Sequence, residues 1–148
     1  MTTLSTQQAQ ALLTAAQEAA RHAYAPYSDF PVGAALLCAD GRVITGTNVE
    51  NASFGLTNCA ERSALFAAIS QGIRDFQAIA VWAKKRPHGA ITPCGACRQV
   101  MLELLAGETP VYSHDPETGT MTHTSVTALL PAAFGADRQH SFPGTDNS

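Results

Sequence analysis

Residues 32–49 read VGAALLCADGRVITGTNV, and the fold is predicted most directly from them. The first part, Val32–Cys38, is small and apolar throughout, which is typical of a strand that is buried on both faces. Asp40-Gly41 is a pair well suited to a tight hairpin turn, and Val43–Val49 then predicts the returning strand. The stretch therefore predicts a β-hairpin whose first strand lies inside a sheet.

The segments on either side of this hairpin alternate between helical and strand patterns. Ser5 can cap a first helix that reaches about Ala23 and ends before Pro26. The remaining predicted elements are helices at 59–71, 94–106 and 125–130 and strands at 76–83, 111–113 and 121–124. This order predicts the α/β class, a three-layer α-β-α sandwich around a mixed sheet of about five strands. We expect one domain over residues 1–148, with a core at about 5–134 and a loose polar tail at 135–148.

Composition excludes several classes of protein and of partner. Of the 148 residues, 45% are apolar and 14% are charged, against a usual charged share of about 25%, which excludes disorder, collagen and coiled coil. So little charge in a small chain indicates surface that is hidden by self-association. The nine Lys and Arg are scattered, so no nucleic-acid partner is expected. No apolar run approaches the ~20 residues of a membrane span and no signal peptide is evident, so the cytoplasm is the predicted location.

The four cysteines are the strongest chemical signal. In a reducing compartment they indicate metal binding or catalysis before disulfides. Three of them lie in two short segments, Cys59-Ala60-Glu61 and Pro93-Cys94-Gly95-Ala96-Cys97, each at a predicted helix N-terminus. The partial positive charge there favours thiolates, and the two N-termini can converge at one end of the sheet. Three thiolates can hold Zn²⁺ and leave its fourth position open for water.

Two charged residues next to Cys59 extend this hypothesis. Glu61 lies two residues past a predicted ligand, so its carboxylate can reach a zinc-bound water and accept its proton without binding the metal. Three thiolates leave the zinc site with net negative charge, and we hypothesise that Arg62 hydrogen-bonds a thiolate to compensate. A Cys-x-Glu segment followed by Pro-Cys-x-x-Cys is the layout of zinc nucleobase deaminases.

Over nearly its whole length the chain resembles the small, homotetrameric cytidine deaminases of the cytidine/deoxycytidylate deaminase superfamily. The segments that carry the resemblance are Tyr27–Leu36, Asn48–Ala52, Asn58–Arg62, Pro93–Val100 and Leu129–Phe134. The resemblance implies one Zn²⁺ per chain, held by Cys59, Cys94 and Cys97, with Glu61 as the catalytic proton carrier. It implies hydrolytic deamination of cytidine and deoxycytidine to uridine and deoxyuridine with release of ammonia, in pyrimidine salvage.

The same resemblance implies the substrate contacts. Phe30 would pack near the base, Asn48 and Glu50 would hydrogen-bond the ribose, and the backbone around Ala60 would contact the pyrimidine edge. Phe54 and Phe134 would reach the active site of a neighbouring subunit; the family often has tyrosine at the position of Phe54. A carboxylate at Glu50 also accepts bonds from hydroxyls and repels phosphate, which favours a free nucleoside over a nucleotide.

Other interpretations stay open from the residues themselves. Cys94-x-x-Cys97 could be a redox pair, or the cysteines could form a non-catalytic zinc-binding module, although none of the five histidines has a spacing that suits a fourth ligand. A deaminase of nucleoside antibiotics would share both cysteine segments. Phe30 could be plain core, Glu50 a solvated charge and Phe134 an anchor of the last helix. Cys38, inside an apolar strand, is predicted to be an inert core thiol.

Overall fold

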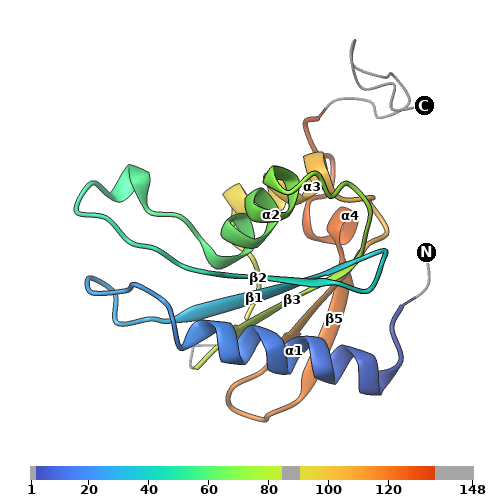
Figure 1. The fold of residues 1–148 in the computed structure, drawn as a ribbon, viewed down its shortest axis with the longest axis horizontal. Coiled ribbons are helices and arrows are strands. Elements are labelled where there is room, and N and C mark those ends of the chain that lie inside the picture. The colour runs from blue at the N-terminus through green and yellow to red at the C-terminus, as the bar shows by residue number, and fades with distance from the viewer. Residues whose placement is uncertain (1–2, 85–90, 136–148) are drawn as a thin grey trace.

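A mixed five-stranded sheet forms the middle layer of the protein (Figure 1). The structure, a computed structural model, describes residues 3–84 and 91–135. The strands lie in the order β2-β1-β3-β4-β5, and the pairing of β3 with β4 is parallel while the other three pairings are antiparallel. Their bounds are β1 Val32–Cys38, β2 Val43–Thr47, β3 Phe76–Ala83, β4 Pro110–His114 and β5 Met121–Ser125. The predicted mixed sheet of about five strands is confirmed.

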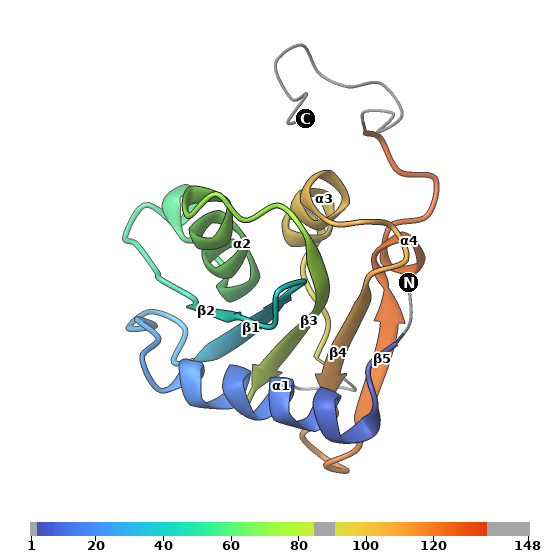
Figure 2. The ribbon, with the colours of Figure 1, turned by 45° about the vertical axis from the view of Figure 1, so that its right-hand side comes forward.

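Helices cover both faces of this sheet and complete the three layers. The helix α1, Thr6–Ala20, packs against β1 and β3 on one face, while α2, Ala60–Ser70, and α3, Gly95–Leu104, lie together over the other (Figure 2). The short helix α4, Val126–Leu129, packs beside α3, and a 3-10 turn, η1, spans Phe54–Leu56. In the described ranges no helix has the length and apolar character needed to cross a bilayer. The predicted loose tail lies outside the described residues from position 136 onward.

The two central strands are buried on both faces, as the apolar run predicts. Along β1, Ala34 and Leu36 face the α2 side while Ala35 faces α1, and all three are fully buried. The core on the α2 and α3 side is built from larger side chains, among them Leu36, Leu65, Ile79, Met101, Leu105 and Val111. On the α1 side small alanines predominate, so that helix can lie close to the sheet.

Two glycines of the hairpin permit this close packing. A Cβ on Gly33 would lie 1.8 Å from the carbonyl oxygen of Ala16 in α1. A Cβ on Gly46 would lie 2.4 Å from the backbone nitrogen of Ala64 in α2. Because backbone atoms cannot move aside as a side chain can, both positions require glycine. The same hairpin therefore sets how closely a helix approaches each face of the sheet.

We expect Gly33→Ala to destabilise the protein by more than about 3 kcal/mol, beyond the usual cost of overpacking, since α1 must shift as a whole. The free energy of unfolding from urea titration is the measurement. Gly55→Ala is the control, because a Cβ at Gly55 meets no atom within 4 Å. Equal stability of both variants would contradict the packing described for α1 and β1.

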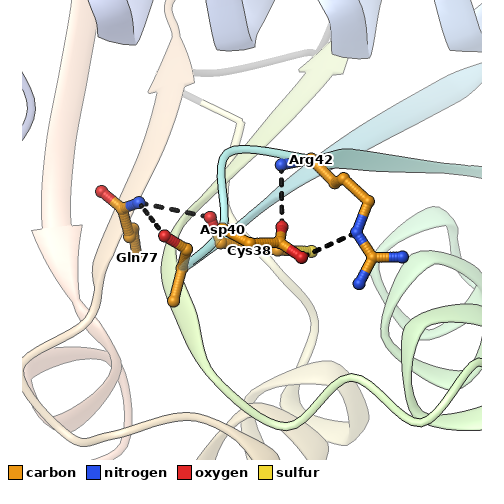
Figure 3. Close-up of polar contacts among 5 residues, drawn as sticks. Cys38, Asp40, Arg42 and Gln77 are labelled. Carbon is orange, nitrogen blue, oxygen red and sulfur yellow. Dashed lines mark hydrogen bonds and ion pairs between the residues drawn. The ribbon is translucent and has the colours of Figure 1, made fainter.

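The predicted turn at Asp40-Gly41 is present and is one residue longer than the tightest hairpin. Gly41 N donates to Cys38 O at 3.0 Å, and Gly41 adopts φ +92°, the left-handed region that favours glycine. The Asp40 carboxylate accepts from Arg42 N at 3.0 Å and Arg42 Nε at 2.8 Å (Figure 3). On the other side of the turn, Gln77 Nε2 donates to Cys38 O at 3.2 Å, which ties the hairpin to β3 (Figure 3).

Three predicted element ends are wrong by two residues or more, each because a tertiary contact decides the boundary. Helix α1 ends at Ala20 instead of about Ala23, since Tyr24 leaves to form a bridge with Val49. The same bridge ends β2 at Thr47 instead of Val49. Helix α3 ends at Leu104 instead of 106, because Leu105 takes an extended backbone and buries its side chain.

Candidate active site and metal centre

Three cysteine sulfurs meet where two helices begin. Cys59 and Cys94 are the N-cap residues of α2 and α3, both with extended backbone, and Cys97 lies one turn into α3. The sulfurs of Cys59 and Cys94 are 3.7 Å apart, and all three sulfurs lie within 4.8 Å of one another. None of these cysteines is in a disulfide. The predicted convergence of the two helix N-termini is therefore confirmed.

The sulfur positions fit a zinc ion. With Zn–S bonds of about 2.3 Å, tetrahedral geometry requires sulfurs about 3.8 Å apart, close to the observed 3.7 Å. Within the described part of the chain, this cluster contains no fourth His, Cys, Asp or Glu ligand. Three thiolate ligands without a fourth protein ligand are the donor set of a catalytic site.

The cluster is electrostatically prepared for a cation. The Cys97 thiol donates a hydrogen bond to the Cys59 sulfur, and Arg62 Nη2 donates to the same sulfur at 3.1 Å. Together these two donors lower the pKa of Cys59 to about 5. The same bond to Cys59, together with burial, raises the pKa of Cys97. One thiolate is thus present near neutral pH, and the hypothesised hydrogen bond from Arg62 to a thiolate is observed.

Glu61, two residues after Cys59, lies at the same site as the three sulfurs. It lies in the first turn of α2, is 4% exposed, and contributes to the wall of the cavity described below. Burial raises the pKa of its carboxyl, and the nearby Cys59 charge adds to the effect. A carboxyl with a raised pKa is suited to accept and return protons near neutrality.

A cavity of about 290 Å³ opens beside the sulfurs. That volume is near the lower end of the range for small-molecule sites. Its described lining is Ser28, Phe30, Val32, Asn48, Glu50, Thr57, Asn58, Cys59, Ala60, Glu61, Val81, Ile91, Thr92 and Cys94. The cavity therefore joins the cysteine cluster and Glu61 to the predicted substrate residues Phe30, Asn48, Glu50 and Ala60. None of its described lining residues is Lys, Arg or His.

Asn48 and Glu50 are both held in place by the loop that precedes β1. The Asn48 side chain donates to Phe30 O at 2.8 Å and accepts from Val32 N at 2.9 Å. The Glu50 carboxylate accepts from Tyr27 N at 2.9 Å, from Ser28 N at 3.1 Å and from the Ser28 hydroxyl at 2.5 Å. The Ser28 hydroxyl, foremost among these donors, holds the pKa of the Glu50 carboxyl below its ordinary value. Glu50 is therefore a fixed anion in the cavity wall and not a loose solvated charge.

The two aromatic residues that the resemblance assigns to a neighbouring subunit lie outside this cavity. Phe54 is 78% exposed and stands edge-to-face with Tyr27, with 6.2 Å between ring centroids. It lines a second cavity of about 330 Å³ that shares Ser28, Glu50 and Thr57 with the first. Phe134 is 90% exposed and its carbonyl accepts from Gln99 Nε2 at 2.7 Å. Phe134 therefore does not anchor the last helix to the core of its own chain.

Ser28 is a site residue that the sequence argument did not single out. It bonds Glu50 through both its backbone and its hydroxyl, and that hydroxyl also accepts from Phe30 N at 3.1 Å. Its neighbour Asp29 has φ +52°, so the loop is held in an uncommon conformation around the carboxylate. The sequence signal was weak, because 22 residues separate Ser28 from Glu50.

A buried carboxyl beside three sulfurs at two helix N-termini, over a mixed sheet with helices on both faces, defines a zinc-dependent deaminase. Residues 6–113 match the family model described as "Cytidine and deoxycytidylate deaminase zinc-binding region", and the chain belongs to this family. A cytidine deaminase of Halalkalibacterium halodurans is 56% identical over 129 residues, which are 86% of this chain and 95% of that protein.

Solved structures agree with this assignment. The crystal structure of cytidine deaminase from Burkholderia pseudomallei superposes with a TM-score of 0.79 at 54% identity, covering 84% of this chain and 98% of that one. Cytidine deaminase from Mycobacterium tuberculosis gives a TM-score of 0.71 at 43% identity, covering 86% of this chain and 97% of that one. The predicted family and fold are both confirmed.

Proposed function

We propose that this chain is a cytidine deaminase that converts cytidine and deoxycytidine, with water, to uridine and deoxyuridine and ammonia. The observation that carries the proposal is one cavity with the three-sulfur cluster and buried Glu61 at one end and the fixed Glu50 carboxylate at the other. Relatives named cytidine deaminase at 56% and 48% identity support the reaction. We place the reaction in pyrimidine salvage in the cytoplasm.

Cys59, Cys94 and Cys97 would hold one zinc ion, which when bound acts as a Lewis acid and lowers the pKa of water from 15.7 toward about 7. Glu61 accepts a proton from the attacking water and delivers it to ring nitrogen N3, which makes carbon C4 more electrophilic. After the water oxygen has added to C4, Glu61 takes the second proton from that hydroxyl and passes it to the 4-amino group; the C4–N bond breaks and ammonia leaves. Burial of Glu61 excludes bulk water from these transfers. It also raises the pKa of the carboxyl, which suits it both to accept and to donate a proton.

Arg62 sets the charge of the cluster. In the zinc-free chain we expect the Cys59 thiolate to titrate with a midpoint of about 5, so that it is protonated below and ionised above that pH. Arg62→Ala is expected to raise this midpoint, because the hydrogen bond and the positive charge that favour the thiolate are both lost. Ultraviolet thiolate absorbance measures the midpoint, and in the zinc-loaded enzyme the acidic limb of the pH–rate profile moves to higher pH. An unchanged midpoint and profile would refute the role of Arg62.

Asn48 and Glu50 retain capacity for a ribose. An amide has two donor hydrogens and two acceptor lone pairs, and the described bonds of Asn48 use one of each. The Glu50 carboxylate has about four acceptor sites and uses three. Asn48 therefore keeps one donor and one acceptor site, and Glu50 keeps one acceptor site, for bonds to sugar hydroxyls. Phe30, half-buried against Val81 and Ile91, offers an apolar wall for the base, and the backbone at Ala60 faces the same cavity.

Glu50→Gln tests the ribose contact. We expect KM for cytidine to rise about tenfold while kcat changes little, because a charge-assisted hydrogen bond is lost equally from the bound substrate and the transition state. Steady-state kinetics on cytidine provide both constants. A fall in kcat at unchanged KM would instead place Glu50 at the reacting centre.

The cavity chemistry selects a nucleoside over a nucleotide. A phosphate near the ribose would face the Glu50 carboxylate, and the described lining offers no cationic side chain to offset the repulsion. We therefore expect cytidine to be deaminated and cytidine monophosphate to be a poor substrate. A nucleoside-antibiotic deaminase would instead prefer a modified nucleoside in the same absorbance assay, and a non-catalytic zinc module would act on none.

We further propose a homotetramer in which neighbouring subunits complete each site. Phe54 and Phe134, both exposed in the single chain, are the residues expected to reach a neighbour. Other large apolar side chains are exposed with them, namely Tyr24, Tyr27, Val43, Val49, Leu56 and Phe66. Such a surface in a chain with 14% charged residues is suited to burial between copies. Size-exclusion chromatography with light scattering tests the assembly, and a monomeric mass would refute it.

A further inference from the structure

One of the three sulfurs lacks the support that the other two receive. Cys59 is held by the guanidinium of Arg62, and Cys97 is fully buried in the core. Cys94 is exposed, and as N-cap of α3 its side chain caps no backbone N–H. Apart from the 3.7 Å contact between its sulfur and that of Cys59, its position therefore depends on the backbone that leads into it.

Arg98 fixes that backbone. Its Nε donates to Pro93 O at 2.8 Å, on the residue directly before Cys94. Pro93 is buried and has no N–H of its own, so its carbonyl is the one backbone group through which it can be hydrogen-bonded. Arg98 lies one turn after Cys94, and its side chain runs back toward the helix N-terminus, the usual direction on a helix.

The other end of the guanidinium is attached to a rigid element. Arg98 Nη1 donates to Leu129 O at 2.8 Å, at the C-terminus of α4, where helix carbonyls lack partners within the helix. That helix is itself fixed: Ser125 caps it through Ala128 N, and Val126 is 1% exposed. Figure 2 shows α3 and α4 next to each other on the side of the sheet opposite α1, so one planar guanidinium can span both.

The neighbouring residue on α3 repeats this connection. Gln99 donates to Phe134 O, so α3 holds the segment 129–134 at both of its ends. Ala132 in that segment has φ +50°, a conformation that a non-glycine residue keeps when its surroundings impose it. The C-terminal segment at 129–134 is thus part of the frame around the cysteine cluster.

We propose that Arg98 is the positioning residue for the Cys94 ligand: it clamps the Pro93 carbonyl to the end of α4 and thereby presets the third sulfur for zinc. The proposal rests on the proposed zinc centre and adds a residue that supports it without touching metal or substrate. Loss of the clamp leaves Cys94 free to depart from the position seen beside Cys59. The ion is then bound more weakly, although the fold persists.

The test compares two arginines that make the same kind of contact. Arg74 Nη1 also donates to two carbonyl oxygens, Ile69 O at 2.9 Å and Ile73 O at 3.1 Å. It does so at the far end of α2, about 15 Å along the helix from Cys59. Arg74→Gln is therefore a control for the general loss of an arginine–carbonyl clamp.

Zinc dissociation constants are measured by competition with a chromogenic chelator, and thermal midpoints are measured on the zinc-free proteins. We expect Arg98→Gln to weaken zinc binding about 10–100-fold, the usual effect of losing an outer support of a metal ligand, while Arg74→Gln stays within about twofold. Arg98→Lys keeps the charge without the planar fork and is expected to lie between Arg98→Gln and the wild type. Because it preserves the charge and the apolar stem, Arg98→Lys is also the variant to read if Arg98→Gln does not fold.

Wild-type zinc affinity in Arg98→Gln, full rescue by Arg98→Lys, or an equal loss in Arg74→Gln would overturn the proposal. A wild-type chain that binds no zinc would overturn the proposed metal centre itself, so the two failures are distinguishable.

Discussion

Replacing Glu61 by glutamine is expected to lower kcat for cytidine about 10⁴-fold, the upper end of the range for general acid–base catalysis, because one carboxyl serves both proton transfers. Glutamine has nearly the same shape as glutamate but cannot accept and return a proton. Since Glu61 is not among the clustered sulfur ligands, zinc content per chain is expected to stay unchanged. Loss of cytidine absorbance measures turnover, and elemental analysis measures the metal.

The control for this prediction is Glu108→Gln, which removes an exposed carboxylate between α3 and β4. We expect its kcat to equal that of the wild type. Near-normal turnover of Glu61→Gln would show that another group carries the proton. Loss of zinc together with turnover would make Glu61 a support of the metal instead.

Cys94→Ala is expected to lose the bound zinc and, with it, measurable deamination. Removing one of three thiolates leaves two protein ligands, which is fewer than a catalytic zinc site uses. The expected result is zinc well below one ion per chain after dialysis and turnover at the background level. Circular dichroism is expected to show the fold retained, because the Cys94 side chain is exposed and contributes little to the core.

The fourth cysteine provides the matched control. Cys38 is fully buried in β1, outside the three-sulfur cluster, and burial raises the pKa of its thiol. Cys38→Ala therefore keeps zinc and turnover, with a stability loss of about 1 kcal/mol from the small cavity. If Cys38→Ala loses zinc and Cys94→Ala retains it, the ligand assignment is wrong.

The sheet could be predicted from sequence because its central strands have one physical requirement. Strands that are covered on both faces need continuous small or branched apolar residues, and β1 and β3 were therefore bounded correctly at Val32–Cys38 and Phe76–Ala83. Gly33 and Gly46 carried further information that the pattern alone did not reveal. Their role depends on which helix lies over each strand, and that is a property of the packed structure.

The reactive end of the site could be predicted because its residues lie close together in sequence. Two short segments contain the three sulfurs, Glu61 and Arg62, and both begin helices. Helix N-termini favour anions, so the spacing of the cysteines and the electrostatics of the helices both predict a cluster of thiolates. The fold brings the two segments into contact, although Cys59 and Cys94 are 35 residues apart in the sequence.

The supports of the site could not be predicted, because they join distant segments through backbone atoms. Ser28 reaches Glu50 across 22 residues and Arg98 reaches Leu129 across 31. Every residue has a backbone carbonyl, so the sequence does not indicate which carbonyl accepts a side-chain hydrogen bond. The early end of α1 has the same origin, since Tyr24 N donates to Asn48 O and draws the chain away from the helix.

Zinc content and substrate turnover, measured on one preparation of the full chain, decide whether the protein is a zinc-dependent cytidine deaminase. We expect one zinc ion per chain, deamination of cytidine that is lost on chelation and restored by added zinc, and little turnover of cytidine monophosphate. A chain that carries no zinc, or one that is fully loaded with zinc and inert toward cytidine, would contradict that assignment.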